Sequence, residues 1–416
     1  MKRTLALLLA CVLGLSALSG CAPASAAKEL TAPKLSTTPA DSEEVNQALS
    51  AFGLELLRLA RDGGKSSVLV SPLSVALALS MAANGAEGET LAQFQEVLGG
   101  GTDLVELNEA CAQLMVDYQN LAGSTKCSIA NSLWVDPEGQ IKDEFIGKCR
   151  GIFDAQVFAA ELSAPGIVKD LNGWVSKHTN KLIPEIINEP FDEDAALLLA
   201  NALYLKNKWL SEFDPLSTHE RDFRHEDGSS TRMDFLSKHN ATLSYLQGKG
   251  GQGVALPYDD GRLAFVAILP DLYPDSPDLG QWLNNLEGNS LSQLIINRED
   301  ALFLSFAMPK FSAEWKGNLE DILPELGLED AFDVARADFS SLGENPYGYY
   351  IDKVVHAAKI EVNEKGTEAA AATVVAANGG AAPPPPEGIT LVLDRPFLYG
   401  IVDLYTGVPL FLGTYE

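Results

Sequence analysis

The sequence predicts one large α+β domain. Helical patterns fill the first part of the chain, strand patterns dominate from Met233 onward, and the two kinds do not alternate strictly. Roughly 375 residues remain after a short apolar leader and a linker rich in Ala, Pro, Ser and Thr, which is enough for a single sizeable core. No internal repeat divides these residues into two units.

The helices are predicted from the spacing of apolar residues. Residues 46–59 place large apolar side chains on one helix face. Ser71-Pro-Leu-Ser74 precedes a segment so apolar that it must be buried on all sides. The helices expected, in chain order, span 46–59, 75–83, 91–98, 167–187 around Trp174, and 320–332.

Continuous apolar runs predict the strands. Residues 197–205 contain Asn201 as their single polar residue, which is typical of a strand buried on both faces. Residues 248–253 spell a dinucleotide-binding loop by letter, but a strand-like segment follows where a helix would have to hold the pyrophosphate, so we expect a hairpin turn. The strands expected span 128–135, 197–205, 241–247, 254–257, 263–269, 302–309, 353–362, 389–393, 397–403 and 409–413.

Residues 1–20 are predicted to be a signal peptide. Lys2 and Arg3 precede an apolar stretch that is too short for a membrane-spanning helix of a folded protein. The stretch ends on Leu-Ser-Gly-Cys21, which resembles a bacterial lipobox. We therefore expect cleavage before Cys21, lipidation of that cysteine and attachment to the bacterial cell surface. Ordinary cleavage between 24 and 27, giving a freely extracellular protein, is the alternative.

The composition of residues 21–41 predicts a flexible tether, because their few apolar side chains cannot offset the loss of conformational entropy on ordering. The folded domain is then expected at 42–416. The chain has a net charge of −27 from 30 basic and 57 acidic residues, which argues against nucleic acid and against electrostatic binding to anionic lipid. Membrane attachment would therefore depend on the lipid at Cys21.

The remaining cysteines predict neither a metal site nor redox chemistry. Cys111, Cys127 and Cys149 are left once Cys11 and Cys21 are set aside, and no Cys-x-x-Cys or histidine cluster accompanies them. We expect buried structural thiols, with one disulfide among the three as the alternative. The sequence also lacks a Gly-x-Ser-x-Gly elbow and a His-Glu-x-x-His motif, so no catalytic residue, metal or cofactor is predicted.

Residues 364–386 form an unusual segment. They read Glu-Lys-Gly-Thr-Glu-Ala-Ala-Ala-Ala-Thr-Val-Val-Ala-Ala-Asn-Gly-Gly-Ala-Ala and end in four prolines. The alanines would suit a helix or a linker. As a strand, however, the segment would place small or β-branched side chains on one face, at 367, 369, 371, 373, 375 and 377, with Glu368 facing water. Such a strand could slip over a packed core.

This segment resembles the hinge of the inhibitory serpins, and further motifs of that family follow one another in order along residues 45–416. They are Ser-Pro-Leu-Ser at 71–74, Gly-Ala-Glu-Gly-Glu-Thr at 85–90, Ile-Ala-Asn-Ser-Leu-Trp at 129–134, the segments 172–180 and 200–209, Leu-Pro-Tyr-Asp-Asp-Gly at 256–261, Ile-Leu-Pro at 268–270, Phe332 with Ala-Asp-Phe-Ser at 337–340, His356, and Arg-Pro-Phe-Leu-Tyr at 395–399.

The resemblance implies a serpin fold with three β-sheets, about eight to nine helices and an exposed reactive-centre loop at about 364–388. It implies a suicide inhibitor and not an enzyme. A serine protease attacks the loop and forms an acyl-enzyme, and the loop then inserts into the main sheet as a new strand. The resemblance also implies that the active conformer is kinetically trapped. The protein is expected to act as a monomer.

The resemblance also assigns roles to residues. The hinge would comprise Glu364, Gly366, Thr367, Glu368, Ala369, Ala370, Ala371, Ala372 and Thr373. The shutter, where the sheet parts, would comprise Ser71, Ser74, Asn201 and His356, and Trp209 would lie at the breach where the loop first inserts. Taken alone, His356 would be a core histidine and Trp209 a core aromatic.

The target protease would be set by the cleaved bond. Hinge spacing points to Gly380 and Ala381, within a window that also includes Ala377, Asn378, Gly379 and Ala382, and counting back from Arg395 can give Ala382 instead. The window offers no basic or aromatic side chain, so an elastase-like or subtilisin-like protease is expected. A non-inhibitory serpin that acts as a binding or structural surface protein is the alternative.

Overall fold

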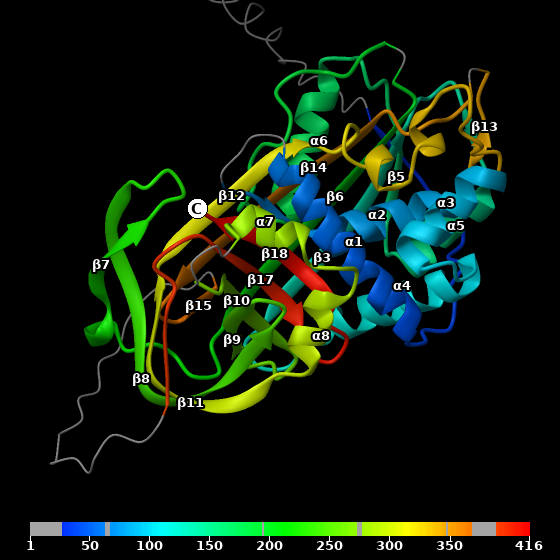
Figure 1. The fold of residues 1–416 in the computed structure, drawn as a ribbon. Helices are drawn as coiled ribbons and strands as arrows, with labels where there is room; N and C mark the ends of the chain where they lie inside the picture. The colour runs from blue at the N-terminus through cyan, green and yellow to red at the C-terminus, as the bar shows by residue number, and fades with distance from the viewer. Residues whose placement is uncertain (1–26, 63–66, 194, 273–276, 347, 368–387) are drawn as a thin grey trace, which may run out of the picture.

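The computed structural model describes residues 27–62, 67–193, 195–272, 277–346, 348–367 and 388–416 (Figure 1). This part of the chain contains eight α-helices and three sheets, as the sequence predicted for an α+β fold. The helices are α1 (Glu43–Asp62), α2 (Pro72–Ala83), α3 (Gly88–Gly99), α4 (Leu104–Gln119), α5 (Asp143–Ile152), α6 (Gly166–His178), α7 (Leu279–Asn284) and α8 (Ser290–Ile296).

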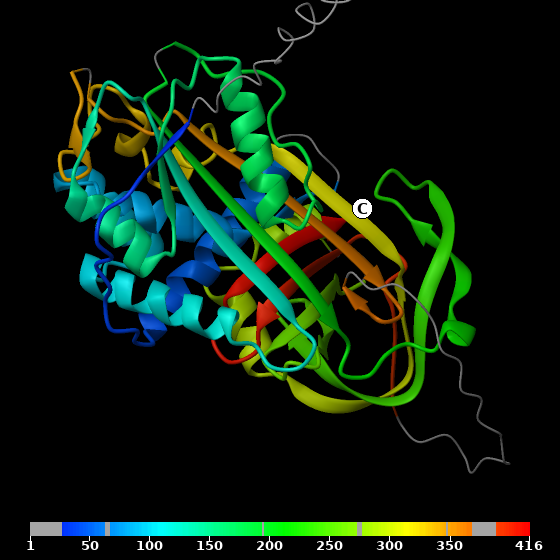
Figure 2. The same cartoon turned by 180° about the vertical axis from the view of Figure 1, so that it is seen from behind.

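Sheet A has seven strands. Their order is β1 (Lys28–Leu30), β5 (Gln156–Ala159), β3 (Lys126–Val135), β6 (Leu197–Lys208), β15 (Gly366–Thr367), β14 (Lys353–Asn363) and β12 (Phe311–Asn318). β6 also pairs directly with β14 at one end. Figure 2 shows α6 lying across the outer face of this sheet.

Sheet B has nine strands, and β4 (Gln140–Ile141) and β13 (Gly343–Glu344) form a small third sheet. The order in sheet B is β16 (Ile389–Val392), β11 (Glu299–Pro309), β8 (Ser230–Gly248), β9 (Gly251–Pro257), β10 (Leu263–Pro270), β17 (Phe397–Asp403), β18 (Pro409–Tyr415) and β2 (Leu69–Val70), with β7 (His219–Arg224) beside β8. Lys249 and Gly250, both at positive φ, turn the β8–β9 hairpin, so the prediction of a turn at 248–253 is confirmed.

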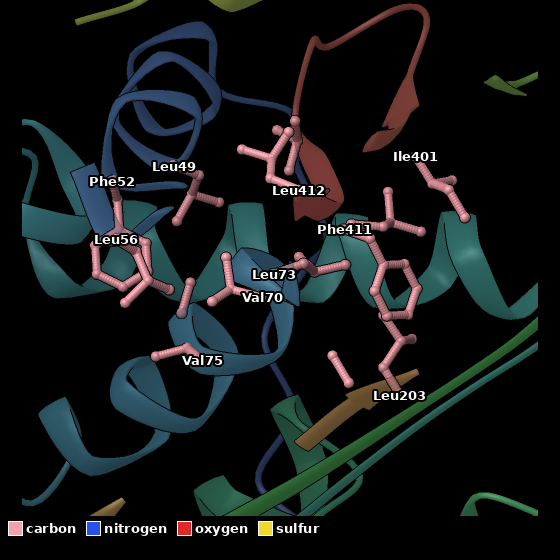
Figure 3. Packing of buried hydrophobic residues seen from close by; sticks show 14 of the residues in the cluster. Leu49, Phe52, Leu56, Val70, Leu73, Val75, Leu203, Ile401, Phe411 and Leu412 are labelled. Atoms are coloured by element: carbon pink, nitrogen blue, oxygen red, sulfur yellow. The ribbon is translucent and has the colours of Figure 1, made fainter. Parts of the chain in front are cut away.

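The main core lies between the helices and the two large sheets. Leu49, Phe52 and Leu56 of α1 pack near Leu73 of α2 and Leu412 of β18 (Figure 3). All twelve residues of α2 are buried, as its apolar composition predicted. Its burial on every side is possible because other helices and both large sheets surround it.

β6 is buried on both faces, and the two faces meet different cores. Its residues Leu197, Leu199, Leu203 and Leu205 belong to the main core. Its alternate residues Leu198, Ala200 and Ala202 belong to a second cluster with α6 side chains such as Ile167 and Trp174. A strand added beside β6 would therefore direct its side chains alternately into these two cores.

The structure corrects two expectations about secondary structure. Residues 320–332 form only two short 3₁₀ turns, η2 (Pro324–Leu326) and η3 (Asp330–Phe332), because Pro324 lacks an amide donor and Gly327 has a φ of 103°. α6 ends at His178, before Asn180 and Lys181, both of which have positive φ. The helices α4, α5, α7 and α8 were not singled out from the sequence.

A third correction concerns the predicted tether. From Lys28 onward the segment lies against the body: β1 pairs with β5, the Leu35 amide donates to the Gly147 carbonyl, and the Ala40 amide donates to the Glu109 carbonyl. Backbone hydrogen bonds order this segment, although it has few apolar side chains to pack against the body. Residues 21–26 of the predicted tether lie outside the described residues.

The three cysteines within the described ranges are free thiols. Burial raises the pKa of Cys111 to about 11 and that of Cys127 to about 12, so both stay protonated at neutral pH. In the same ranges, no helix is long and apolar enough to cross a bilayer.

Candidate functional site

Sheet A contains a strand position that is only partly filled. β15, only two residues long, lies between β6 and β14 and runs antiparallel to both. Towards the opposite end of the sheet, β6 and β14 pair directly with each other, with Lys353 opposite Leu198 and Val355 opposite Ala200. The site therefore consists of two parallel strands that are held apart at one end by the start of the hinge and joined at the other.

Trp209 fixes the turn that leads into β15. Its indole Nε1–H donates to the Asn363 carbonyl at 2.8 Å, and its backbone N–H donates to the Lys365 carbonyl at 3.0 Å. Its ring stacks on Tyr258 with a centroid separation of 4.9 Å. The Tyr258 hydroxyl lies 2.6 Å from the Thr367 hydroxyl, and Thr367 is buried. Trp209 thus lies beside the turn that leads into the predicted hinge, and its breach role stays a prediction.

Glu364 anchors the same turn electrostatically. Its carboxylate accepts hydrogen bonds from Lys310 Nζ and from the Thr218 hydroxyl, each at 3.1 Å, while its carbonyl accepts from the Phe213 amide at 2.8 Å. Partial burial raises the pKa of this carboxyl, but a backbone hydrogen bond, Lys310 and Thr218 outweigh burial and lower the pKa below its usual value. Glu364 is therefore ionised at neutral pH and holds the hinge to β11 and its neighbours.

The shutter residues Ser71, Ser74 and His356 are in contact. The Ser71 amide, at the start of α2, donates to His356 Nε2 of β14 at 3.0 Å. The Ser71 hydroxyl lies 2.9 Å from the Ser74 hydroxyl and 2.7 Å from the Leu410 carbonyl oxygen of β18. Because Nε2 accepts a hydrogen bond here, it carries no proton of its own, and the imidazole is neutral with its proton on Nδ1. Helix α2, sheet A and sheet B thus meet at one polar point inside an apolar core.

Asn201 belongs to the same layer but bonds elsewhere. Its Nδ2 donates to the Asn131 Oδ1 of β3, and Asn131 Nδ2 in turn donates to the Phe153 carbonyl at 3.0 Å. Asn201 Oδ1 is buried and has no hydrogen-bond partner among the described residues. An unpaired buried acceptor is costly, and here it lies on β6 at the edge where that strand faces β14.

Several residues of the site were not identified from the sequence. Asn131, Tyr258 and Lys310 hold Asn201, Thr367 and Glu364 in place. Asn131 had a signal, since it and Ser132 are the polar residues in the otherwise apolar strand segment 129–135. The partner choices of Tyr258 and Lys310 depend on tertiary packing and leave no local pattern.

Other predicted residues lie outside the described residues. They are hinge residues Glu368, Ala369, Ala370, Ala371, Ala372 and Thr373, the window Ala377, Asn378, Gly379, Gly380, Ala381 and Ala382, and Cys21. Within the described ranges, no cluster of three or more His, Cys, Asp or Glu side chains is arranged to hold a metal ion.

Comparison with known proteins matches the chain to one family. The family model described as "Serpin (serine protease inhibitor)" matches residues 47–416. Serpin-Z2B of Triticum aestivum is 34% identical over 82% of this chain and 88% of its own length. The plasma serine protease inhibitor of Bos taurus is 30% identical over 92% of this chain and 91% of its own length.

A solved structure extends this likeness to the conformation. The native state of tengpin, a thermophilic serpin, is 32% identical and superposes with a TM-score of 0.84, covering 93% of this chain and 98% of its own. The latent state of tengpin superposes with a lower TM-score, 0.76, covering 91% of this chain and 98% of its own. The chain is thus more similar to the native than to the latent structure.

We expect His356 to make the native state sensitive to acid. Burial lowers the pKa of His356 to about 4, against about 6.5 in an unfolded chain. Between these values the unfolded chain binds a proton that the native state does not bind. Native stability should therefore fall as the pH drops from about 6.5 to about 4, by about 3 kcal/mol from this group. Denaturant unfolding of the wild type and of His356→Gln across this range measures the difference.

Carboxyl groups titrate in both proteins, so only the difference between the two pH profiles reports on His356. Glutamine keeps an acceptor for the Ser71 amide but does not titrate. Parallel profiles for the two proteins would contradict a neutral, desolvated imidazole at the shutter.

Proposed function

The chain belongs to the serpin family, and we propose that it is an inhibitory member that traps a serine protease as a covalent acyl complex. The protease serine attacks the carbonyl carbon of Gly380, the bond to the Ala381 nitrogen breaks, and that nitrogen leaves as a free amine after taking up a proton. The acyl ester would persist because the freed hinge inserts into sheet A before water can hydrolyse the ester. The partly filled strand position is the observation that carries this proposal.

The register of that position supports full insertion. Thr367 lies opposite Asn207 of β6 and Val362 of β14, and both pairings are antiparallel. Each further loop residue would therefore pair one residue further back on both strands. Six residues on, Thr373 would lie between Asn201 and His356. The inserted hinge would thus meet the shutter at the point where Asn201 has an unpaired acceptor.

The two neighbouring strands already have the relative register that insertion needs. Lys353 now pairs with Leu198. Counting nine residues on from Thr367, Ala376 would pair with these same two residues. β6 and β14 would therefore part sideways by one strand spacing, about 4.8 Å, without sliding lengthwise. Such a motion exchanges hydrogen bonds but leaves the packing along each strand in register.

The chemistry of the loop fits both faces of the inserted position. Thr367 faces the main core, so alternation would direct 369, 371, 373 and 375 the same way. Val374 would face the second core between Ala200 and Val355, which already belong to the cluster under α6. Glu368 would lie opposite Lys206 on the outer face. The small side chains of the loop would thus lie where the two cores are already packed.

The residues around the proposed bond favour a protease with a shallow specificity pocket. Gly380 and its neighbours offer no basic or aromatic side chain, and Val374 and Val375 precede them. We propose an elastase-like or subtilisin-like target. We also propose that the protein is a lipoprotein anchored through Cys21 to the outside of the bacterial cell envelope, since the leader ends on a lipobox-like sequence.

We expect residues 22–416 to form a complex with an elastase or a subtilisin that survives denaturing gels. Mass spectrometry should find a C-terminal fragment beginning at Ala381. Cleaved protein should unfold at a higher temperature than intact protein, because the inserted strand gains a hydrogen-bond ladder on both sides. Cleavage without a complex and without thermal stabilisation would contradict the inhibitory proposal and favour a binding or structural role.

A matched pair of variants separates insertion from cleavage. Thr367→Arg places a long cation on the buried face of β15, so the loop should be cleaved without trapping the protease. Glu368→Arg makes a similar change at a position expected to face water, and it should retain the complex. Equal losses in both variants would show that the effect comes from protease recognition and not from insertion.

We expect Thr373→Val to destabilise the cleaved form selectively. In the inserted register the Thr373 hydroxyl could donate to Asn201 Oδ1, and its loss should cost about 1 kcal/mol. The melting temperature of the cleaved protein should fall, while that of the intact protein should stay unchanged. A double-mutant cycle with Asn201→Ala tests the pair, and an additive cycle in the cleaved form would contradict this register.

A further inference from the structure

The N-terminal arm, residues 28–42, is docked on a surface built to receive it. Its strand β1 pairs with the edge strand β5, and Arg150 of α5 donates to the Ala32 carbonyl. The face of α5 that meets the arm carries Gly147 and Gly151. A Cβ at Gly147 would lie 2.6 Å from the Pro33 carbonyl oxygen, and one at Gly151 would lie 2.2 Å from that of Leu35. Only glycine permits this approach of the arm's backbone.

The arm begins at the end of sheet A that is opposite to the hinge. Lys28 pairs with Ala159, Ala159 with Val135, and Val135 with Leu197 at the first residue of β6. The hinge residue Thr367 pairs with Asn207, ten residues further along β6, which corresponds to about 33 Å. In Figure 2 the dark blue start of the described chain and the orange hinge lie towards opposite ends of the sheet.

The pole where the arm begins is acidic. Asp136, Glu138, Glu161 and Glu193 line a groove of about 880 Å³ there, together with apolar residues such as Tyr350. Asp136 directly follows Val135, which pairs with Ala159 of β5, and Ala159 in turn pairs with Lys28 at the start of the arm. Carboxylates repel an anionic lipid surface, so this pole would not adhere to it. A lipid on Cys21 would therefore hold the molecule by the arm alone, with the hinge pole directed away from the membrane.

This placement conflicts with a completed trap. If the proposed function holds, the inserted loop ends opposite Leu197, and the acylated protease hangs from the same pole at which the anchor begins. Lys28 is the seventh residue after Cys21, and this stretch fully extended spans at most about 25 Å. A protease of about 220 residues has a radius of gyration of about 17 Å, hence a diameter of about 40 Å. The docked arm leaves too little room between the body and the bilayer.

The arm's contacts are weak enough to resolve this conflict. β1 contributes only three residues to the sheet edge. The Lys34–Asp154 ion pair has both side chains more than half exposed, and Leu35 is exposed as well. Ala32 is the arm's buried apolar side chain in the core. Once released, the 22 residues from Cys21 to Ser42 could extend to about 70 Å.

We propose that residues 28–42 are a releasable spacer between the inhibitor and a lipid bilayer. Docked, the arm directs the hinge pole away from the membrane, where a protease can reach the loop. Released, it lets the trapped protease occupy the membrane-facing pole. This inference rests on the proposed function for the release step, whereas the docked orientation can be tested without any protease.

A disulfide that locks the arm tests the release. Lys28 and Ala159 are directly paired across antiparallel strands, a separation that a disulfide can bridge, so Lys28→Cys with Ala159→Cys would fix β1 on β5. Chains beginning at Cys21 are first oxidised so that the 28–159 disulfide forms, are then coupled through the remaining Cys21 thiol to a maleimide phospholipid in neutral vesicles, and are mixed with the protease trapped by the soluble protein. We expect a several-fold loss of covalent complex on vesicles, full trapping in solution, and recovery on vesicles after reduction.

A matched control lengthens the tether without touching the lock. Twenty Gly and Ser residues inserted before Lys28 should restore trapping by the oxidised protein on vesicles, because they supply the missing clearance. Unchanged trapping by the locked, short-tethered protein on vesicles would overturn the release. Loss of trapping by the locked protein in solution as well would also overturn it, since the lock would then act on insertion and not on clearance.

Energy transfer tests the orientation independently. Donor dyes at Glu138→Cys and Leu210→Cys, on the two poles, are compared in lipid-anchored protein with acceptor dyes in the bilayer surface. Strong transfer from position 138 and weak transfer from 210 would support the docked arm as the spacer. Equal transfer from both would overturn it. Failure of the soluble protein to trap any protease, with this orientation intact, would refute the proposed function and the release while leaving the arm's placement standing.

Discussion

The direct pairing of β6 with β14 is the interaction on which the rest of the structure depends. These strands hold each other over Lys353–Val355 through parallel pairing, while β15 occupies only two residues of the position between them. A longer strand in that position would bond to both neighbours and bury its side chains in two existing cores. The present arrangement is therefore expected to be less stable than the filled one, and it persists as long as nothing frees the hinge to enter.

The polar seam beneath this pairing explains how such strands can part. Apolar side chains packed across the gap would lose their contacts when the sheet opens and would leave a cavity. Ser71, His356 and Asn201 instead form directional bonds that can be exchanged for bonds to a new strand. The native state bears this cost: burial keeps the imidazole neutral, and the amide oxygen of Asn201 has no hydrogen-bond partner among the described residues. These polar contacts thus allow β6 and β14 to part, but they lower the stability of the native state.

The sequence predicted the strands and helices whose signals are local, and it predicted the site through its order of motifs. The apolar run of β6 and the wholly apolar α2 needed no tertiary information. The family resemblance singled out Ser71, His356 and Trp209, and the structure places Ser71 against His356 and Trp209 against Asn363, while their roles stay predictions. Partners were not predictable: period-two alternation assigns Thr367 to a face but cannot show that Asn207 and Val362 lie beside it. The arm was misjudged because glycines on α5, far along the chain, make its docking possible.

The register proposed for the inserted loop divides the loop into a part that would enter the sheet and a part that would lie beyond it. The strand position ends where β6 begins, so Ala377 would be the last loop residue to find a partner, Leu197. Small side chains between Thr367 and Ala377 are needed for insertion. The residues from Asn378 to Ala382 would lie beyond the sheet, where no packing restricts their size. Insertion therefore does not account for their being Asn, Gly and Ala, and under the proposed function it is the specificity pocket of the target protease that would select them.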